Sequence, residues 1–241
     1  DLLSIGRQAR RELYQLQPVP YDPPVPARYC LETGGRLGAD GSVVEALTAQ
    51  DLESLKNHII KLNPKSVAIN LLFSFLDDHF ERQIEAMIPK HIYVSRSSNI
   101  LPEHKEYERG IATWLNASVQ PIVSQYLHNL KCKLQSQYVG ATKISVMQSS
   151  GGTIEIDQAA EKSINLMLSG PAGGLAGARY VAAQSNIDRL LTFDMGGTST
   201  DVAVIDGDMQ LTTEGRIAGY PVAVSMVDMH TIGAGGGSIA T

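Results

Sequence analysis

The segment Leu190–Asp206, LLTFDMGGTSTDVAVID, constrains the fold more than any other part of this chain. Two runs of apolar and β-branched residues flank a Gly-Gly-Thr-Ser-Thr sequence, which predicts a strand, a tight turn and a second strand. Because glycine has no Cβ, the backbone of such a turn can approach a phosphate closely, and the hydroxyl groups add donors. The segment therefore predicts a phosphate-binding loop, with an ordinary β-hairpin as the alternative.

The expected contacts of this loop follow from its residue types. The candidate phosphate-binding residues are Gly196, Gly197, Thr198, Ser199 and Thr200. Asp194 and Asp201 stand at the two shoulders, and carboxylate oxygens suit Mg²⁺, so both are candidate metal ligands. A Walker loop would need a Gly-Lys-Ser/Thr sequence, and a Rossmann fingerprint would lead from a strand into a helix. Neither pattern fits a turn without lysine that joins two strands.

Predicted strands and helices alternate before this segment. We expect a small hairpin over 28–47, helices over 50–62, 77–87 and 105–134, the last interrupted near Pro121, and strands over 66–75, 91–95, 143–148 and 153–156. Residues 169–183 predict a further helix of small residues, capped by Ser169 and with Pro171 in its first turn. This alternation is typical of an α/β fold with parallel strands covered by helices.

A second glycine-rich segment lies near the end of the chain. Gly235, Gly236 and Gly237 offer consecutive backbone N–H groups, which predict an anion nest. Asp228 and His230 come shortly before them and are candidate catalytic residues, because an acid and an imidazole can move protons or orient a substrate. The alternative for this segment is a flexible glycine turn.

Several segments resemble one protein family. FDMGGTSTDVAVI resembles the second phosphate loop of the actin, sugar-kinase and heat-shock-chaperone ATPase superfamily, and more fully that of the hydantoinase A/5-oxoprolinase/acetone carboxylase β-subunit group. The opening DLLSIGRQARRELYQL is similar to the linker after that group's first module. Other motifs of the group follow in the expected order: LPEHKEYERG at 101–110, MQSSGG at 147–152, SGPAGGLAGARYVA at 169–182 and GYPVAVSMVDMHTIGAGGGSIA at 219–240.

The resemblance implies an incomplete actin-like (ribonuclease H-like) ATPase fold. Residues 1–48 would form a linker and small hairpin, residues 49–186 the remainder of a first lobe with an interlobe helix, and residues 187–241 the start of a second lobe. We expect the chain to be an internal piece of a longer protein. A first phosphate loop and a long C-terminal part would then lie outside it.

The resemblance also implies the reaction and the cofactors. The whole protein is expected to use ATP and Mg²⁺ to phosphorylate the carbonyl oxygen of a cyclic amide, such as a hydantoin or 5-oxoproline, so that water can open the ring. Asp194, Asp228 and His230 would be catalytic. An acetone carboxylase β-like role and a non-catalytic actin-like nucleotide-binding module remain alternatives. The expected partner is a second copy or a hydantoinase B-like subunit, and the residues do not decide the substrate or the oligomeric state.

Composition excludes other classes of function. With 43% hydrophobic residues, 241 residues suffice for a substantial core, and a net charge of −5 argues against nucleic-acid binding. The longest apolar stretches are too short to span a membrane, so we expect a cytoplasmic protein. Cys30 and Cys132 predict reduced thiols, and no histidine has metal-ligand spacing.

Two polar clusters are less specific. The charged run with Glu103, Glu106, Glu108 and Arg109 is typical of a solvated helix start, and only the resemblance gives it a further role. Gln148, Ser149 and Ser150 are weaker candidates for lining the ligand cleft.

Overall fold

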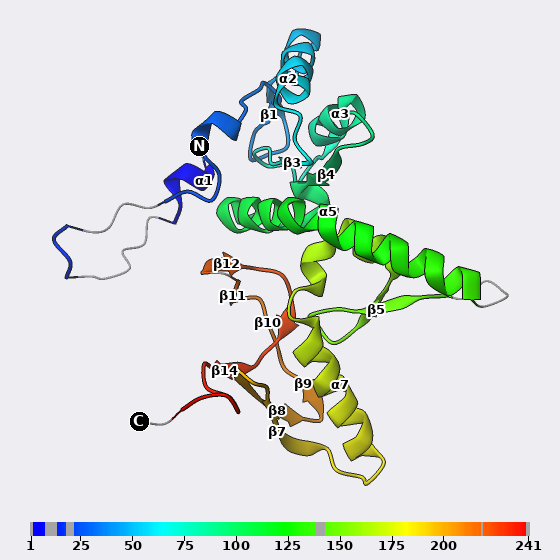
Figure 1. Ribbon diagram of the computed structural model, residues 1–241. Helices are drawn as coiled ribbons and strands as arrows, with labels where there is room; N and C mark the ends of the chain where they lie inside the picture. Colours follow the sequence, from blue (N-terminus) through cyan, green and yellow to red (C-terminus); the bar gives the residue numbers. More distant parts are fainter. Residues whose placement is uncertain (1, 8–13, 18–21, 138–142, 218, 240–241) are drawn as a thin grey trace. The chain divides into compact units, whose positions relative to one another are not determined.

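A computed structural model describes residues 2–7, 14–17, 22–137, 143–217 and 219–239 (Figure 1). Its contacts divide the chain into two compact units. The first unit comprises Asp1–Pro121 and Gly219–Val222, and the second comprises Ile122–Ala218 and Ala223–Thr241.

The described helices and strands are mostly short. The helices are α1 (Leu2–Ile5), α2 (Ala49–Leu62), α3 (His79–Met87), α4 (Ser97–Ile100), α5 (Glu106–Gln137), α6 (Ile156–Glu161) and α7 (Ser169–Ala183), with 3₁₀ turns at Ala27–Tyr29 and Ser163–Leu166. The strands are β1 (Arg36–Leu37), β2 (Val43–Glu45), β3 (Ser66–Ile69), β4 (Tyr93–Arg96), β5 (Ser145–Met147), β6 (Thr153–Glu155), β7 (Arg189–Met195), β8 (Thr200–Asp206), β9 (Asp208–Met209), β10 (Leu211–Thr212), β11 (Gly215–Ile217), β12 (Tyr220–Val222), β13 (Met226–Val227) and β14 (His230–Ile232).

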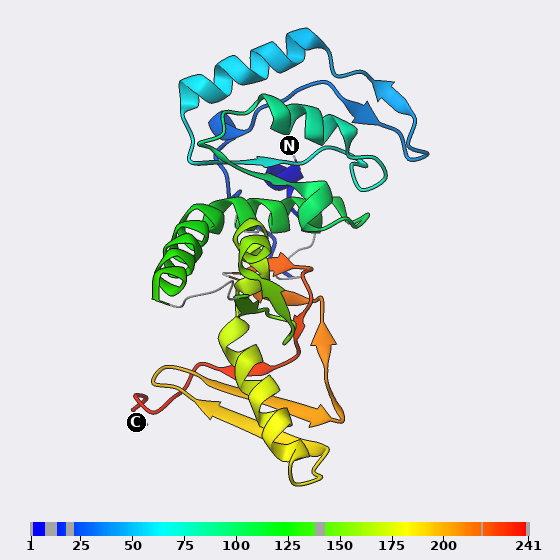
Figure 2. The same cartoon turned by 90° about the vertical axis from the view of Figure 1, so that its right-hand side faces the viewer.

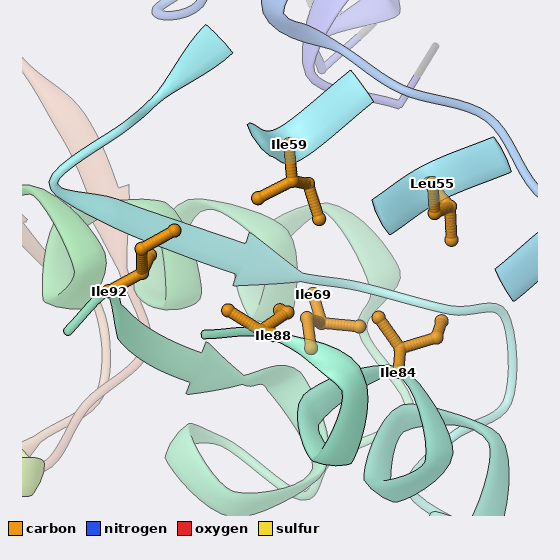
Figure 3. Packing of buried hydrophobic residues seen from close by; sticks show 6 residues of the cluster. All are labelled: Leu55, Ile59, Ile69, Ile84, Ile88 and Ile92. Atoms are coloured by element: carbon orange, nitrogen blue, oxygen red, sulfur yellow. The ribbon is translucent and has the colours of Figure 1, made fainter. Parts of the chain in front are cut away.

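The first unit contains the expected hairpin and parallel strand pair. β1 and β2 are antiparallel, and Gly41 in the turn between them has φ +80°, which glycine adopts without strain. β3 and β4 are parallel, as their alternation with helices predicts. Helices α2 and α3 pack with this pair around one apolar cluster (Figure 3). Its buried members are Leu55, Ile59, Ile69, Ile84, Ile88 and Ile92.

Helix α2 shows how local sequence sets an element. The Thr48 hydroxyl accepts a hydrogen bond from the Asp51 N–H, and the Asp51 carboxylate accepts one from the Thr48 N–H, which forms a capping box. Hydrogen bonds from Thr48 lower the pKa of Asp51. The helix ends at Asn63 in the left-handed region with φ 46°, a conformation that asparagine tolerates well.

Two predictions for the first unit are wrong. The strand expected over 66–75 stops at Ile69, because the following backbone turns, with Phe73 at φ +58°. Helix α5 runs through Pro121 without the expected interruption. Proline removes one N–H donor, and the hydrogen bonds of the adjacent turns carry this long helix past it.

The charged run at the start of α5 is only partly solvated, since Glu103 is exposed but Arg109 is not. Arg109 is fully buried; its guanidinium donates to the Glu103 carbonyl at 2.7 Å, the Leu71 carbonyl at 2.9 Å and the Ser97 hydroxyl at 3.2 Å, and it pairs with Glu106. Glu81, also fully buried, accepts the Ser97 hydroxyl at 2.6 Å. The expectation of a solvated helix start is therefore wrong for Arg109, which ties the loops after β3 and β4 to α5.

The second unit is built around the strand pair expected at the phosphate loop. β7 and β8 are antiparallel over seven residue pairs, and β14 joins the free side of β8 to give the order β14-β8-β7. Helix α7 lies across one face of β7 and β8 (Figure 2). The apolar cluster at that face has five buried members, which are Ala172 and Leu175 of α7, Ala203 and Ile205 of β8, and Val227 of β13.

Two further expectations need correction in the second unit. β5 pairs with β6 in the antiparallel sense, whereas the alternation of strands and helices predicts parallel strands. Their turn needs Gly151, which has φ +80°. Ser169 is not the cap of α7, because Leu168 occupies the N-cap position with φ +67° and no side-chain hydrogen bond caps the helix. Pro171 does lie in the first turn of α7.

The units do not follow the lobe boundary expected at 186/187. Contacts divide the chain at Pro121 instead, so α7 belongs to the same unit as β7 and β8. The reason is packing, since Ala172 and Leu175 of α7 share a core with Ala203 and Ile205 of β8. The assignment of residues 49–186 and 187–241 to two lobes stays a prediction.

Candidate phosphate-binding site

The register of β7 and β8 places the two shoulder acids side by side. Asp194 pairs directly with Asp201, and directly paired residues of antiparallel strands carry their side chains on the same face. Thr231 of β14 pairs with Asp201, and its hydroxyl donates to the Asp201 carboxylate at 2.7 Å. One carboxylate oxygen of Asp201 therefore has a protein donor, and Asp194 is exposed.

The face that carries these acids borders a cavity. Its volume is about 340 Å³, and it lies between α7 and the strands. Its lining includes the two acids and the apolar or small residues Pro171, Gly174, Leu175, Ala178 and Met229. A largely apolar hollow with two carboxylates in its lining is typical of a ligand site.

The glycine-rich segment near the chain end packs directly on the turn between β7 and β8. The N–H of Gly236 donates to the Gly196 carbonyl at 2.9 Å, and the N–H of Gly237 donates to the Gly197 carbonyl at 2.8 Å. The N–H of Gly235 donates to the Ser238 hydroxyl at 3.0 Å. Since these three donors have protein acceptors, the expected nest of free N–H groups gains no support from the structure, and a site role for these glycines stays a prediction.

The same contacts orient the peptide groups of the turn. In a trans peptide the carbonyl of one residue and the N–H of the next point in opposite directions, and no cis peptide is found in the described residues. Because the carbonyls of Gly196 and Gly197 face the glycine-rich segment, the N–H groups of Gly197 and Thr198 point away from it. Neither N–H has a hydrogen-bond acceptor within the described part of the chain, which leaves both available to an anion.

Thr200 does not present its hydroxyl in the expected way. The residue is 3% exposed, and its hydroxyl donates to the Ala234 carbonyl at 2.7 Å. Its side chain lies on the strand face opposite to that of Asp201, because successive strand residues alternate. The structure thus uses Thr200 to hold the glycine-rich segment, whereas Thr198 is exposed and Ser199 partly so.

The structure does not bring His230 to the acids. His230 pairs with Val202, one position away from the pair of Thr231 with Asp201, so its side chain lies on the opposite face of the sheet. Asp228 is exposed, and its N–H donates to the Gln210 carbonyl at 2.8 Å. The catalytic roles expected for His230 and Asp228 therefore gain no support from their placement.

The Gln148–Ser150 candidates belong to the β5–β6 turn. Ser149 is buried, its hydroxyl donates to the Ser225 carbonyl at 3.2 Å and its N–H donates to the Asn165 carbonyl at 2.7 Å. These bonds account for Ser149 as a structural residue that joins loops within the second unit.

Comparison with known proteins decides the family. Residues 109–241 match the family model described as hydantoinase/oxoprolinase, and residues 1–92 match the hydantoinase/oxoprolinase N-terminal region. The first match alone covers more than half of the chain. The chain belongs to the hydantoinase/oxoprolinase family.

Relatives and solved structures agree with this family. The chain is 27% identical to a 5-oxoprolinase of Dictyostelium discoideum, over 99% of this chain and 22% of that protein, and 28% identical to caprolactamase subunit alpha of Pseudomonas jessenii, over 90% and 32%. It matches the crystal structure of the ATP-dependent caprolactamase of that species with a TM-score of 0.78 and 26% identity, covering 98% of this chain and 34% of that one. Nucleotide-free acetone carboxylase matches with a TM-score of 0.77 and 26% identity, covering 90% and 31%.

These matches confirm the expected family and the mixed α/β class, and they are consistent with part of an actin-like ATPase. The chain spans about a third or less of the length of these relatives. In this hydantoinase/oxoprolinase chain, the gap between the two family matches runs from residue 93 to residue 108 and contains β4, α4 and the first residues of α5.

The acid pair fits a magnesium ion that is bound jointly with phosphates. Mg²⁺ is commonly held by one or two protein carboxylates, with water and phosphate oxygens completing its shell. Asp194 and Asp201 supply two carboxylates on one face beside the loop. The described residues hold no group of three or more potential metal ligands, so a site formed by protein alone is not found there.

Thr231 and Ala234 were missed as site residues. Thr231 holds the Asp201 carboxylate, and the Ala234 carbonyl holds Thr200. One feature of the sequence could have indicated Thr231: Thr231 and Ile232 are β-branched residues, which favour a strand, and such a strand could pair beside the loop.

Proposed function

We propose that the full-length protein containing this chain uses ATP to hydrolyse a cyclic amide, with the turn between β7 and β8 as one of its phosphate-binding loops. The observation that carries this proposal is the loop geometry. Two adjacent N–H groups, of Gly197 and Thr198, are turned outward beside the paired acids Asp194 and Asp201. Phosphoryl transfer requires mainly positioning and charge stabilisation, and this arrangement offers both.

The proposed residue roles follow from placement. The N–H groups of Gly197 and Thr198, with the hydroxyls of Thr198 and Ser199, bind phosphate oxygens. Asp194 and Asp201 hold Mg²⁺ directly or through water, and Thr231 orients Asp201. The bound ion supplies charge neutralisation at the phosphates.

The proposed reaction explains why ATP is needed. A lactam carbonyl is a poor electrophile because the ring nitrogen donates electrons into it. Transfer of the γ-phosphoryl group to the carbonyl oxygen removes that resistance. Water then attacks the carbon, and the carbon–nitrogen bond breaks to leave an amine and an acyl phosphate. A second water hydrolyses the acyl phosphate to a carboxylate and phosphate. The names of the 5-oxoprolinase and caprolactamase relatives support a cyclic amide as the substrate.

A carboxylase role is the second candidate. The structural match to acetone carboxylase favours it, since the same phosphoryl transfer could activate another carbonyl.

We also propose, for the full-length protein, assembly with a hydantoinase B-like subunit or a second copy, because the caprolactamase relative is named as one subunit of an enzyme. None of the helices in the described ranges has the length and hydrophobicity needed to cross a bilayer. A cytoplasmic location is part of this proposal.

The test is substrate-dependent ATP hydrolysis by the purified full-length protein, alone and with its neighbouring subunit. The assay would offer hydantoin, 5-oxoproline, caprolactam and acetone in turn. We expect ADP and phosphate to form only when a cyclic amide is present. Stimulation by acetone with bicarbonate alone would favour the carboxylase role, and ATP consumption with none of these compounds would favour the nucleotide-binding module.

A further inference from the structure

We propose that the segment Ala234–Ser238 is a support for the phosphate loop and not itself a phosphate ligand, and that Gly235 and Thr200 are the positioning residues of this support. The inference rests on the proposed function, since it assigns a role to residues that surround the same loop. It replaces the anion nest that the glycine sequence suggests.

The first observation is the pair of backbone hydrogen bonds from the support to the loop. The carbonyls of Gly196 and Gly197 are both held, at 2.9 and 2.8 Å, by the N–H groups of Gly236 and Gly237. These bonds fix two successive peptide planes, and a fixed plane also fixes the direction of the N–H on its other side. The support thereby aims the donors of Gly197 and Thr198, which preorganises them for an anion.

The second observation is the closeness of the two backbones. A Cβ on Gly235 would lie 2.6 Å from the Gly196 carbonyl oxygen and 2.9 Å from the Ser199 nitrogen. Both are backbone atoms of the loop, so a larger residue at this position must push the loop and the support apart. A Cβ on Gly236 would lie 3.7 Å from the Gly196 oxygen, which is ordinary van der Waals contact.

The third observation is the buried Thr200 hydroxyl. It donates to the Ala234 carbonyl at 2.7 Å and ties the first strand residue after the loop to the start of the support. Thr200 lies on the face opposite to Asp201, so the support lies on the side of the loop away from the acids. The outward N–H groups therefore point toward the acid side, where Mg²⁺ and phosphates would bind.

The deciding experiment compares two neighbouring alanine variants of the full-length protein. Gly235→Ala places a methyl group against the loop backbone, whereas Gly236→Ala has room, and neither position has a positive φ. We expect the Kd for ATP to rise about tenfold in Gly235→Ala, the loss of one charge-assisted hydrogen bond, and to change less than about twofold in Gly236→Ala. The affinity for adenosine, measured by competition, should be the same in both, because the nucleoside has no phosphate.

A second pair of variants tests the hydroxyl. Thr200→Val should weaken ATP binding, and Thr200→Ser, which keeps the hydroxyl, should restore it. If both residues act through one support, the double variant Gly235→Ala/Thr200→Val loses no more affinity than Gly235→Ala, whereas a direct phosphate contact by Thr200 predicts additive losses. Should Gly235→Ala not fold, the Thr200 pair decides alone.

Three other outcomes would contradict the inference, and each has a different meaning. Equal losses in Gly235→Ala and Gly236→Ala would show that the segment contacts phosphate itself, and unchanged ATP affinity in Gly235→Ala and Thr200→Val would show that the loop needs no support. A full-length wild-type protein that binds no ATP would contradict the proposed function and, with it, this inference.

Discussion

At the scale of single residues, pairing register decides which side chains can share the site. Asp194, Asp201 and Thr231 are directly paired across three strands and lie on one face, while His230 is displaced from Thr231 by one residue and lies on the other. A shift of one residue in a strand moves a side chain to the opposite face. The acid pair and the histidine are therefore separated by the sheet.

This separation predicts different effects of substitution at Asp201 and His230 in the full-length protein. Asp201→Asn should raise the Kd for Mg²⁺-ATP about tenfold, since it removes a charge from the proposed ion site. His230→Ala should change that Kd by less than about twofold, so any loss it causes must appear in substrate-dependent turnover. Isothermal titration calorimetry distinguishes them, and a similar loss of affinity in both variants would refute the assignment of the faces.

A second residue-scale prediction concerns Gly197. A Cβ at Gly197 would meet no atom within 4 Å, so Gly197→Val should fold normally. A β-branched side chain next to the outward N–H should nevertheless block phosphate and weaken ATP binding about tenfold or more. Gly233→Val is the matched control, because Gly233 also has open space and lies outside the loop. Equal ATP affinity for both variants would remove the loop from the site.

At the scale of elements, a buried polar network anchors helix α5. Arg109 supplies hydrogen bonds to carbonyls of two loops and to a hydroxyl, and it has no exposed surface. Removing one partner of a buried ionic cluster leaves charges and carbonyls unpaired, which costs more than the intact cluster contributes.

We therefore expect Arg109→Met to lower the free energy of unfolding by about 3–5 kcal/mol. Arg7→Met is the control in the same unit, since the side chain of Arg7, which pairs with Glu108, is 51% exposed and water can replace it there. That change should cost less than about 1 kcal/mol. Urea unfolding followed by circular dichroism measures both, and comparable costs would mean that Arg109 is accessible to water in solution.

Helix α3 provides a prediction for pH. Hydrogen bonds from Arg82, at 2.7 Å, and Arg96, at 2.8 Å, lower the pKa of Asp78 at the start of the helix. A carboxyl whose pKa is lower in the folded state contributes stability above its unfolded pKa, and this contribution is lost as pH falls through the folded pKa. The loss is thus expected below about pH 4.

Asp78→Asn should remove this part of the acid dependence. We expect the variant to be less stable than wild type at neutral pH and to approach wild type as the pH falls below about 4. Thermal unfolding at a series of pH values measures the difference. A constant difference across the series would show that the ionised form of Asp78 contributes nothing.

Features determined by residues that are adjacent in the sequence could be predicted, whereas features that depend on contacts between distant segments could not. Helix α2 and the strand–turn–strand of β7 and β8 are encoded by adjacent residues, and both were predicted with the correct type. The burial of Arg109 depends on carbonyls and hydroxyls from distant loops, and the occupied glycine N–H groups depend on β14 pairing beside β8. Such long-range pairing leaves no periodic signal within one segment, so motif and spacing arguments did not predict that these glycine N–H groups donate to the carbonyls of the β7–β8 turn.

At the scale of the whole molecule, the second unit exposes an apolar sheet face. The face of the β14-β8-β7 sheet opposite to α7 carries large side chains that are 44–68% exposed. They are Leu191, Phe193, Met195, Val204 and Ile232. A contiguous apolar surface of this kind is unusual on a monomer, and the relatives of this family are about three times as long or longer. The site is therefore best tested in the full-length protein.

The last prediction is that residues 1–241, produced alone, fold in large part but bind ATP weakly and hydrolyse neither ATP nor lactams. The family resemblance implies a triphosphate held by two phosphate loops and a nucleoside pocket, and this chain supplies one such loop. A few backbone and hydroxyl contacts contribute about 1 kcal/mol each, somewhat more when charge-assisted, against several kcal/mol of lost ligand freedom. Calorimetry with ATP and Mg²⁺ should therefore detect little or no binding, whereas micromolar affinity would show that this chain contains a complete nucleotide site.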